Sequence, residues 1–439
     1  MRRRAALGLL AGAAARAADW PQWRGPAANG VAADGDPAPL EWGPEKNVLW
    51  RSATPSWSAA TPIVSGGTVF VTSAEEGFSA TGGGGLARHA VRQLLNTFDG
   101  DDAILLLALD ARTGKERWRQ TLGGGNRIHL KHNEASPSPV TDGSRVWVMT
   151  GLGALGCCDF TGKLVWRRDL AADYGPFGLN WGYGSSPVLD RGRLYVQVLQ
   201  GYKTDEPSYL LALDAATGRP LWKVERPTDA IVESPDAYTT PLLVETAGGR
   251  WLAVTGAGYV TLHGLDDGRE VARIGGLIPN RNEDYRNVAS ATLAGDVLLV
   301  PTRRSPFTAF RITAGPKLER LWTNDHGPDV PTPVSDGERV WLVDDKGIMQ
   351  CLRVEDGEPL WSRRRIEPGL YSSSLVLAGG RVYATSEECT TTVLAAGDDF
   401  QTLAVNKLGE HILASPAIAG GKLFLRTAEA VYCVGGGPG

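Results

Sequence analysis

A repeated string constrains the fold of this chain more than any other feature. The sequence reads LALDARTGKERW up to Trp118 and LALDAATGRPLW up to Trp222, with the Ala-x-Asp and Thr-Gly positions at identical spacing. Degenerate copies of the string end at Trp166, Ala272, Trp322 and Trp361. The mean interval from Trp118 to Trp361, about 49 residues, lies in the range of β-propeller blades. The period therefore predicts a propeller.

A second signature opens each repeat. It is a Ser/Thr-Pro step, or a variant of it, followed by an apolar pair, a Gly turn and an alternating strand. Eight openings begin at Thr61, Ser138, Ser186, Thr240, Ser290, Thr332, Ser373 and Ser415. We expect each blade to run from an inner strand through two middle strands and a Thr-Gly turn to an outer strand that ends in Trp. The sequence thus predicts an all-β, eight-bladed β-propeller of four-stranded antiparallel blades.

The last repeat lacks its outer strand, because the chain stops at Gly439 without another Trp-bearing segment. The string NVLWRSA at residues 47–53 precedes the first opening and can supply that strand. Such pairing would close the ring and remove two exposed sheet edges. We therefore expect a propeller over residues 47–437, closed by an N-terminal strand. An insertion at residues 74–103, with apolar residues about four apart, interrupts the first blade.

Composition and the N-terminus narrow the location and the partners. The net charge is -4, and no basic run exceeds three residues after residue 17, so no nucleic-acid partner is expected. Residues 1–17 combine three arginines, a short apolar run and an Ala-Arg-Ala cleavage pattern, which indicates a signal peptide. Residues 18–46 are then an N-terminal extension. We expect a periplasmic or secreted monomer without a transmembrane anchor.

Two local patterns could carry chemistry. Cys157 and Cys158 are adjacent, but they occupy a strand in which neighbouring side chains point to opposite faces. We expect one thiol in the blade core and the other elsewhere. His129 and His132 form an H-x-x-H pattern, and in extended structure their rings would face opposite sides, so a shared metal is not expected.

The whole mature chain resembles the PQQ-like (pyrroloquinoline quinone) β-propeller repeat proteins, which include quinoprotein alcohol dehydrogenases and BamB-like assembly factors. The segments that carry the resemblance are DWPQWRGPAANGV, KHNEASPSPVTDG, SYLLALDAATG, AYTTP, LAAGDDF and RTAEAVYCV. The enzymes of this superfamily hold PQQ on the propeller axis beside a Ca²⁺ ion and a carboxylate base. No set of Glu, Asn and Asp here matches that site residue by residue. We predict no cofactor and no metal, with PQQ and Ca²⁺ as the alternative.

Polar and aromatic residues precede most inner strands, and propeller geometry places them around one mouth of the central channel. The candidate ligand-binding residues are His132, Asn133, Ser136, Trp181, Tyr183, Ser185, Tyr238, Thr239, Asn287, Asp329, Tyr371 and Ser372. Aromatic faces with hydroxyls, amides and a few charges suit a protein, a peptide or a polar organic ligand such as a carbohydrate. The competing interpretation is that these side chains cap turns and hold water.

These residues favour a noncatalytic extracytoplasmic binding or scaffold propeller, with no catalytic residue predicted. The alternative is a PQQ-dependent quinoprotein dehydrogenase that acts on alcohols or sugars. A carbohydrate-processing enzyme is a more distant third, because no acid pair can be located in the sequence.

Overall fold

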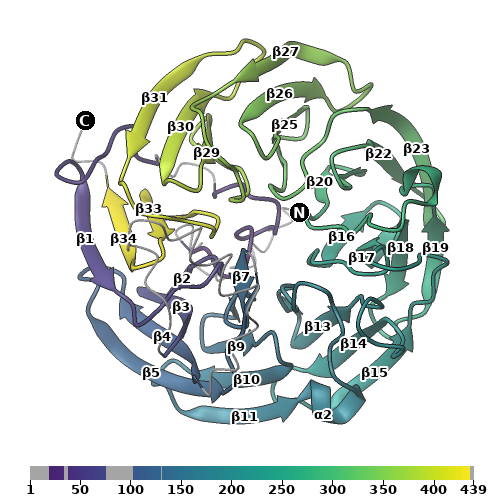
Figure 1. Ribbon diagram of the computed structural model, residues 1–439, viewed down its shortest axis with the longest axis horizontal. Coiled ribbons are helices and arrows are strands. Elements are labelled where there is room, and N and C mark those ends of the chain that lie inside the picture. The colour runs from purple at the N-terminus through teal and green to yellow at the C-terminus, as the bar shows by residue number, and fades with distance from the viewer. Residues whose placement is uncertain (1–18, 34–37, 76–101, 130, 436–439) are drawn as a thin grey trace, which may run out of the picture.

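The computed structural model describes residues 19–33, 38–75, 102–129 and 131–435. Eight four-stranded antiparallel sheets surround a central axis like the blades of a propeller (Figure 1). Each blade is a continuous stretch of sequence, except the last. The predicted eight-bladed fold is therefore confirmed.

The first four blades lie in the N-terminal half of the chain. Their strands are β2 (Ile63–Ser65), β3 (Thr68–Ala74), β4 (Ile104–Asp110) and β5 (Glu116–Gly123); β8 (Val140–Thr141), β9 (Arg145–Met149), β10 (Ala154–Asp159) and β11 (Leu164–Asp169); β12 (Val188–Asp190), β13 (Arg193–Val198), β14 (Tyr209–Asp214) and β15 (Pro220–Glu225); and β16 (Leu242–Thr246), β17 (Gly249–Gly256), β18 (Tyr259–Gly264) and β19 (Glu270–Ile274).

The remaining blades follow in the same pattern. Their strands are β20 (Thr292–Ala294), β21 (Val297–Val300), β22 (Phe307–Thr313) and β23 (Lys317–Asn324); β24 (Val334–Ser335), β25 (Arg339–Val343), β26 (Ile348–Arg353) and β27 (Pro359–Arg365); β28 (Val376–Ala378), β29 (Arg381–Thr385), β30 (Thr390–Ala395) and β31 (Thr402–Lys407); and β32 (Ala417–Ala419), β33 (Lys422–Arg426), β34 (Ala430–Gly435) and β1 (Val48–Ala53).

Short elements connect the blades. They are β6 (Ile128–His129) and β7 (His132–Asn133), which pair as a small hairpin, the helix α2 (Leu170–Tyr174) and the 3₁₀ turn η1 (Pro279–Arg281). Among the described residues, no helix has the length and apolar character needed to cross a membrane.

The repeated Asp-x-x-Thr-Gly element forms the turn between the third and fourth strands of a blade. Asp110 accepts hydrogen bonds from the backbone N–H and the hydroxyl of Thr113 at 2.9 and 3.0 Å. Gly114 then takes a φ of +71°, which glycine adopts at low cost. A Cβ atom at Gly114 would come within 2.6 Å of the Trp50 ring, so the position also requires glycine for packing.

The repeated tryptophans join neighbouring blades. The indole N–H of Trp118 donates to the carbonyl of Phe160 in the next blade at 2.9 Å, and that of Trp222 donates to Leu265 at 3.1 Å. Trp50, Trp166 and Trp322 donate in the same way to the carbonyls of Ala111, Ala215 and Val354. A buried aromatic face and one polar bond thus recur at five blade junctions.

The ring closes as the sequence predicts. Strand β1 pairs antiparallel with β34, and Trp50 lies opposite Cys433. The last blade therefore takes its outer strand from the beginning of the chain, and Figure 1 shows the purple β1 beside the yellow β34. Since Trp50 contacts the turn at Gly114, the same strand also supplies the tryptophan for the junction between the last blade and the first.

The N-terminal segment 19–33 crosses the end of the channel where the inner strands finish. Trp20 forms a β-bridge with Val64 of the first blade, and Val31 forms one with Leu377 of the seventh. Between them the buried guanidinium of Arg24 donates to the carbonyls of Leu375, at 2.6 Å, and Pro333. The segment thus ties the first blade to the sixth and seventh blades.

Two sequence predictions fall outside the described residues. The expected signal peptide at residues 1–17 is one of them. Most of the insertion expected at residues 74–103 is the other, because the described chain stops at residue 75 and resumes at residue 102. The flanking strands β3 and β4 pair with each other from Thr68 opposite Asp110 to Ala74 opposite Ile104.

A candidate ligand-binding pocket in the central channel

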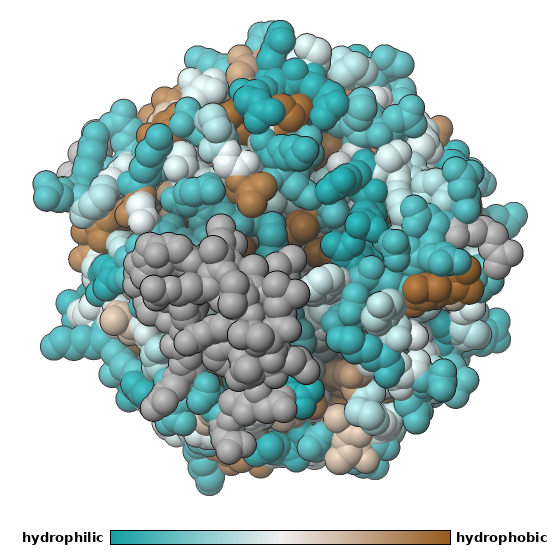
Figure 2. Space-filling view, viewed as in Figure 1, coloured by the Kyte–Doolittle hydropathy of each residue, from teal (hydrophilic) through white to brown (hydrophobic). Residues whose placement is uncertain are grey.

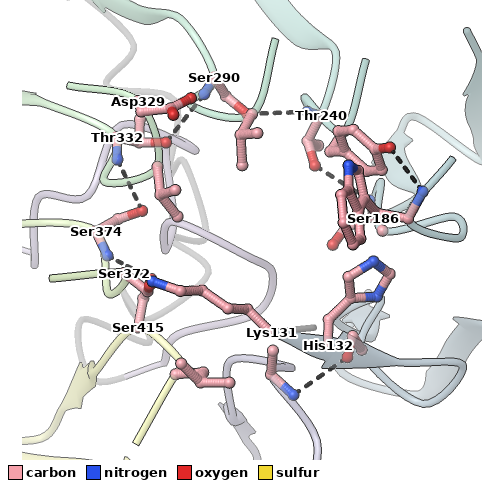
Figure 3. A pocket seen from close by; sticks show the side chains of 18 of the residues that line it. Lys131, His132, Ser186, Thr240, Ser290, Asp329, Thr332, Ser372, Ser374 and Ser415 are labelled. Carbon is pink, nitrogen blue, oxygen red and sulfur yellow. Dashed lines mark hydrogen bonds between the residues drawn. The ribbon is translucent and has the colours of Figure 1, made fainter. Parts of the chain in front are cut away.

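A collar of hydroxyl groups lines the channel where the inner strands begin. In seven blades the Ser or Thr of the opening accepts a hydrogen bond from the backbone N–H of the equivalent residue in the preceding blade, at 2.9 to 3.1 Å. The seven acceptors are Ser138, Ser186, Thr240, Ser290, Thr332, Ser374 and Ser415. Figure 3 shows most of this collar. The openings recognised in the sequence therefore also link blade to blade.

The collar is not continuous. At the junction of the last blade with the first, the equivalent hydroxyl is that of Thr61. Its Oγ1 is buried and has no hydrogen-bond partner among the described residues. The ring of seven bonds is thus interrupted at the place where the two ends of the propeller meet.

A cavity of about 380 Å³ occupies the channel next to the collar. All seven collar hydroxyls line it, and Trp23 from the N-terminal segment contributes to its wall. Because that segment crosses the channel beyond the collar, the cavity has a floor made by the chain's own N-terminal residues. Within the described residues this geometry is that of a cup, whose other end lies among the loops that precede the inner strands.

Six of the residues predicted from the sequence line this pocket. They are His132, Ser136, Trp181, Tyr238, Asp329 and Ser372. Arg286, which stands in the same position before an inner strand, lines it too. The structure thus brings together residues that are up to 240 positions apart in the sequence.

The other predicted residues lie behind the pocket wall and are engaged there. Tyr183 and Tyr371 are buried, and their hydroxyls donate to the carbonyls of Gln197 and Glu367 at 2.9 and 2.8 Å. Ser185 and Thr239 donate in the same way to the carbonyls of Thr239 and Thr255.

The two predicted asparagines, Asn133 and Asn287, also lie behind the pocket wall. The side-chain amide of Asn133 donates to the carbonyl of Trp57 at 2.8 Å. The carbonyl of Asn287 accepts the backbone N–H of Tyr238, also at 2.8 Å. Both residues are almost fully buried. They hold the loops that carry His132 and Tyr238.

A lysine crosses the pocket mouth. Lys131, in the turn of the β6–β7 hairpin, extends across the pocket mouth toward Ser372 of the seventh blade (Figure 3). Its Nζ lies 2.6 Å from the Glu387 carboxylate. The Ser372 hydroxyl donates to the same carboxylate oxygen at 2.5 Å. Since Glu387 is buried, the lysine compensates a charge that water cannot solvate.

Asp329 forms the opposite wall. It is 5% exposed, and its Oδ2 lies within 4.0 Å of three guanidinium groups, those of Arg286, Arg303 and Arg304. Its Oδ1 is buried and has no partner among the described residues. A buried carboxylate oxygen without a donor is costly, so this atom is expected to meet water or a ligand hydrogen.

Aromatic side chains cover a third wall. The Trp181 indole N–H donates to the Glu233 carboxylate at 2.7 Å, and its backbone N–H donates to the Tyr238 hydroxyl at 3.0 Å. The His132 ring stands edge-on to Tyr238, with 6.2 Å between centroids. Burial and the neighbouring His129 lower the pKa of His132 to about 3, so its ring is neutral at pH 7.

The two histidines are closer than the sequence suggested. Their ring centroids are 5.1 Å apart, because His129 and His132 face each other across the two-residue turn of the β6–β7 hairpin. The expectation of opposite sides assumed one extended strand and is wrong. His129 is engaged by Glu134, at 2.9 Å.

Sequence reasoning missed several residues of the pocket. Lys131 directly precedes the predicted His132, but only the three-dimensional structure shows that it reaches Glu387 across the pocket mouth. Asp345 and Trp23 line the pocket from segments that no repeat opening includes. The collar could have been predicted from the sequence, because aligning the eight openings puts a Ser or Thr at the same position of every blade.

Comparison with known proteins places the chain in a family. A family model described as "Outer membrane protein assembly factor BamB" matches residues 101–363. The chain belongs to the BamB family. Comparison with the curated proteins found no match.

Solved structures share the fold of this BamB-family propeller at low identity. BamB from Moraxella catarrhalis is 15% identical with a TM-score of 0.56, over 77% of this chain and 94% of that one. A quinohemoprotein alcohol dehydrogenase from Comamonas testosteroni is 13% identical with a TM-score of 0.65, over 97% and 82%. A europium-containing methanol dehydrogenase is 12% identical with a TM-score of 0.63, over 93% and 89%. These similarities establish the fold and leave the activity open.

The enzyme relatives raise the question of whether a quinone and a metal fit here. Within the described residues, no three side chains of His, Cys, Asp or Glu converge to hold a metal ion. The pocket cations are already close to carboxylates, so a ligand with several carboxylates would find no unpaired charge. These residues do not fit a PQQ–Ca²⁺ site.

The adjacent cysteines do not bear on that site. Both are free thiols in β10, and they point into different cores, Cys157 toward the third blade and Cys158 toward the first. Burial raises the pKa of Cys157 to about 12 and that of Cys158 to about 11. The prediction that the two side chains point to opposite faces is confirmed, but the expectation that only one of them lies in a core is wrong, because both are fully buried in apolar clusters.

Proposed function

We propose that this BamB-family propeller is a noncatalytic extracytoplasmic protein that binds a polar partner in the pocket at the mouth of its central channel. One observation carries the proposal. The buried Asp329 side chain lines a cavity of about 380 Å³, and one of its carboxylate oxygens, Oδ1, has no hydrogen-bond partner among the described residues. A buried acceptor without a donor is costly, and a residue that carries one beside a cavity suits a binding site.

Three further features support binding. The cup has a floor, so a ligand can be enclosed on all sides but one. Its volume falls within the range of small-molecule pockets, about 300 to 1,000 Å³. On the face seen in Figure 2, hydrophilic side chains predominate and hydrophobic ones occur in small groups, which favours a polar partner over an apolar one. Export by the N-terminal signal and a monomeric state belong to the same proposal.

The second candidate is a PQQ-dependent dehydrogenase of alcohols or sugars. It is favoured by the similarity of fold to the alcohol and methanol dehydrogenases. The pairing of the pocket cations with carboxylates speaks against it, because a quinone with several carboxylates would find no unpaired cation there.

One experiment separates the two candidates. The purified protein is titrated with three defined sets of probes: neutral monosaccharides, short peptides with free carboxyl termini, and PQQ with Ca²⁺. Thermal unfolding and reduction of an artificial electron acceptor are both measured. A probe at 100 times its Kd should raise Tm by about 3 °C. We expect a sugar or a peptide to do so, with no electron-acceptor reduction under any condition.

Pocket variants show where the probe binds. Trp181→Leu, which should weaken binding about tenfold or more, is expected to reduce the Tm shift by about half or more. Tyr202→Ala, which changes an exposed aromatic outside the pocket, should leave the shift intact. Electron-acceptor reduction with PQQ, lost in Trp181→Leu, would replace the proposal by the dehydrogenase. A shift that both variants retain would place binding elsewhere and refute the pocket.

A further inference from the structure

The cations around the pocket are balanced by carboxylates. Lys131 lies 2.6 Å from Glu387, Arg286 lies 3.8 Å from Glu233, and the Arg304 side chain lies 4.0 Å from Asp329. Within the described part of the chain, each cation that lines the pocket therefore has a carboxylate within ion-pair distance. A further pocket carboxylate, Asp345, accepts the backbone N–H groups of Asp329 and Val330. A ligand that carries a net charge would disturb this balance in a site of reduced dielectric.

The collar presents hydrogen-bond donors. Each of its seven hydroxyl oxygens already accepts a backbone N–H. None of the seven hydroxyl hydrogens has an acceptor among the residues that the structure describes. A hydroxyl rotates to suit its partner, so these hydrogens are available to a ligand inside the channel. The bottom of the cup therefore favours a ligand rich in oxygen acceptors.

The walls present acceptors and aromatic faces. The Asp329 side chain lines the cavity, and its Oδ1 has no hydrogen-bond partner among the described residues. Trp181 is held in place by two hydrogen bonds, and its ring and that of Tyr238 line the cavity. A ligand that satisfies these groups needs hydroxyl donors on one side and an apolar C–H face on the other.

We infer that the pocket binds a neutral sugar ring. A pyranose carries hydroxyl groups that both donate and accept, has no net charge, and presents an apolar face that packs on aromatic rings. One chemical class thus satisfies the collar donors, the Asp329 carboxylate and the aromatic wall. This inference rests on the proposed binding function and narrows its ligand.

The test compares neutral and charged sugars of the same size. Glucose, galactose, mannose and N-acetylglucosamine are titrated beside glucuronic acid, with tryptophan fluorescence and calorimetry as readouts. We expect at least one neutral sugar to bind, and glucuronic acid to bind more weakly than glucose. Trp181→Leu should weaken the neutral sugar about tenfold or more, as removal of a central aromatic contact does.

Asp329→Asn tests the charge selectivity of the pocket directly, through the ratio of the affinities for glucose and glucuronic acid. Removing one carboxylate leaves the guanidinium groups of Arg286, Arg303 and Arg304 without their shared counter-charge. The variant should lose affinity for glucose and gain affinity for glucuronic acid, so that the ratio of the two shifts toward the acid. Asp296→Asn is the matched control, since Asp296 pairs with Arg311 away from the pocket and should leave the ratio unchanged.

The failures of this inference and of the proposed function are distinguishable. If peptides or PQQ bind in a manner that Trp181→Leu abolishes while no neutral sugar binds, the sugar inference is overturned and the pocket remains a binding site. If no probe binds in a manner that depends on Trp181, both are overturned. If sugars bind but Asp329→Asn leaves the glucose to glucuronic acid ratio unchanged, the charge balance does not select the ligand and the inference is overturned.

Discussion

Replacing Trp222 by Ala tests the junction that recurs around the ring. The indole N–H donates to the Leu265 carbonyl at 3.1 Å, and the ring covers Gly268, where a Cβ would come within 2.6 Å of it. Loss of the hydrogen bond costs about 1 kcal/mol. Loss of the ring from a partly buried site adds about 2 kcal/mol, below the 3 to 5 kcal/mol of a fully buried Trp. The free energy of unfolding should fall by about 3 kcal/mol in total.

The assay is thermal unfolding, in which the change in free energy is read as a change in Tm through the entropy of unfolding. For roughly 390 residues the entropy of unfolding is about 0.8 kcal/mol/K, so 3 kcal/mol lowers Tm by about 4 °C. Trp222→Phe keeps a ring over Gly268 and loses only the N–H, so it should lower Tm by about 1 °C. A Trp222→Ala protein that melts like the parent, or a Phe variant that melts like the Ala variant, would refute the junction.

Two further predictions follow from the buried ionisable groups. Arg24→Met leaves the carbonyls of Leu375 and Pro333 without a donor, so Tm should fall and limited proteolysis should cut the N-terminal segment faster than in the parent; equal cutting rates would contradict its anchoring role. The pKa of His132 is depressed to about 3 in the folded protein, so the unfolded chain binds the extra proton first and stability should fall as pH drops from 6.5 toward 3. His132→Asn should reduce that loss, as measured by Tm across this pH range, and an unchanged pH profile would argue against a neutral ring.

The fold could be predicted from the sequence because the same strand and turn pattern recurs in most blades. Each opening and each Thr-Gly turn is weak alone, yet eight blades require them at one period, and the missing outer strand identified β1 as its replacement. Where a blade lacks the tryptophan, as at Ala272, the sequence pattern weakens and the sheet forms all the same. Sheet pairing there is fixed by its neighbours in the ring.

For the site, the sequence predicts which segments lie at the channel mouth but not which of their side chains face the channel. Every residue proposed for it lies in a segment that leads into an inner strand, and that follows from topology. Whether a side chain faces the channel or the blade behind it depends on one or two backbone angles in an irregular loop. Tyr238 lines the pocket, whereas Tyr183 turns back to bond Gln197. The contact between Lys131 and Glu387 joins segments 256 positions apart, which no local pattern encodes.

The pocket and the closure of the ring depend on the same N-terminal residues. The collar lacks its hydroxyl bond at Thr61, where the last blade meets the first. Strand β1 closes that junction from the outside, and segment 19–33 spans it from the inside by tying Val64 to Leu377 across the eighth blade. The same segment places Trp23 in the cavity. Because segment 19–33 both spans this junction and forms the floor of the cup, loosening of that segment would open the junction and the pocket together.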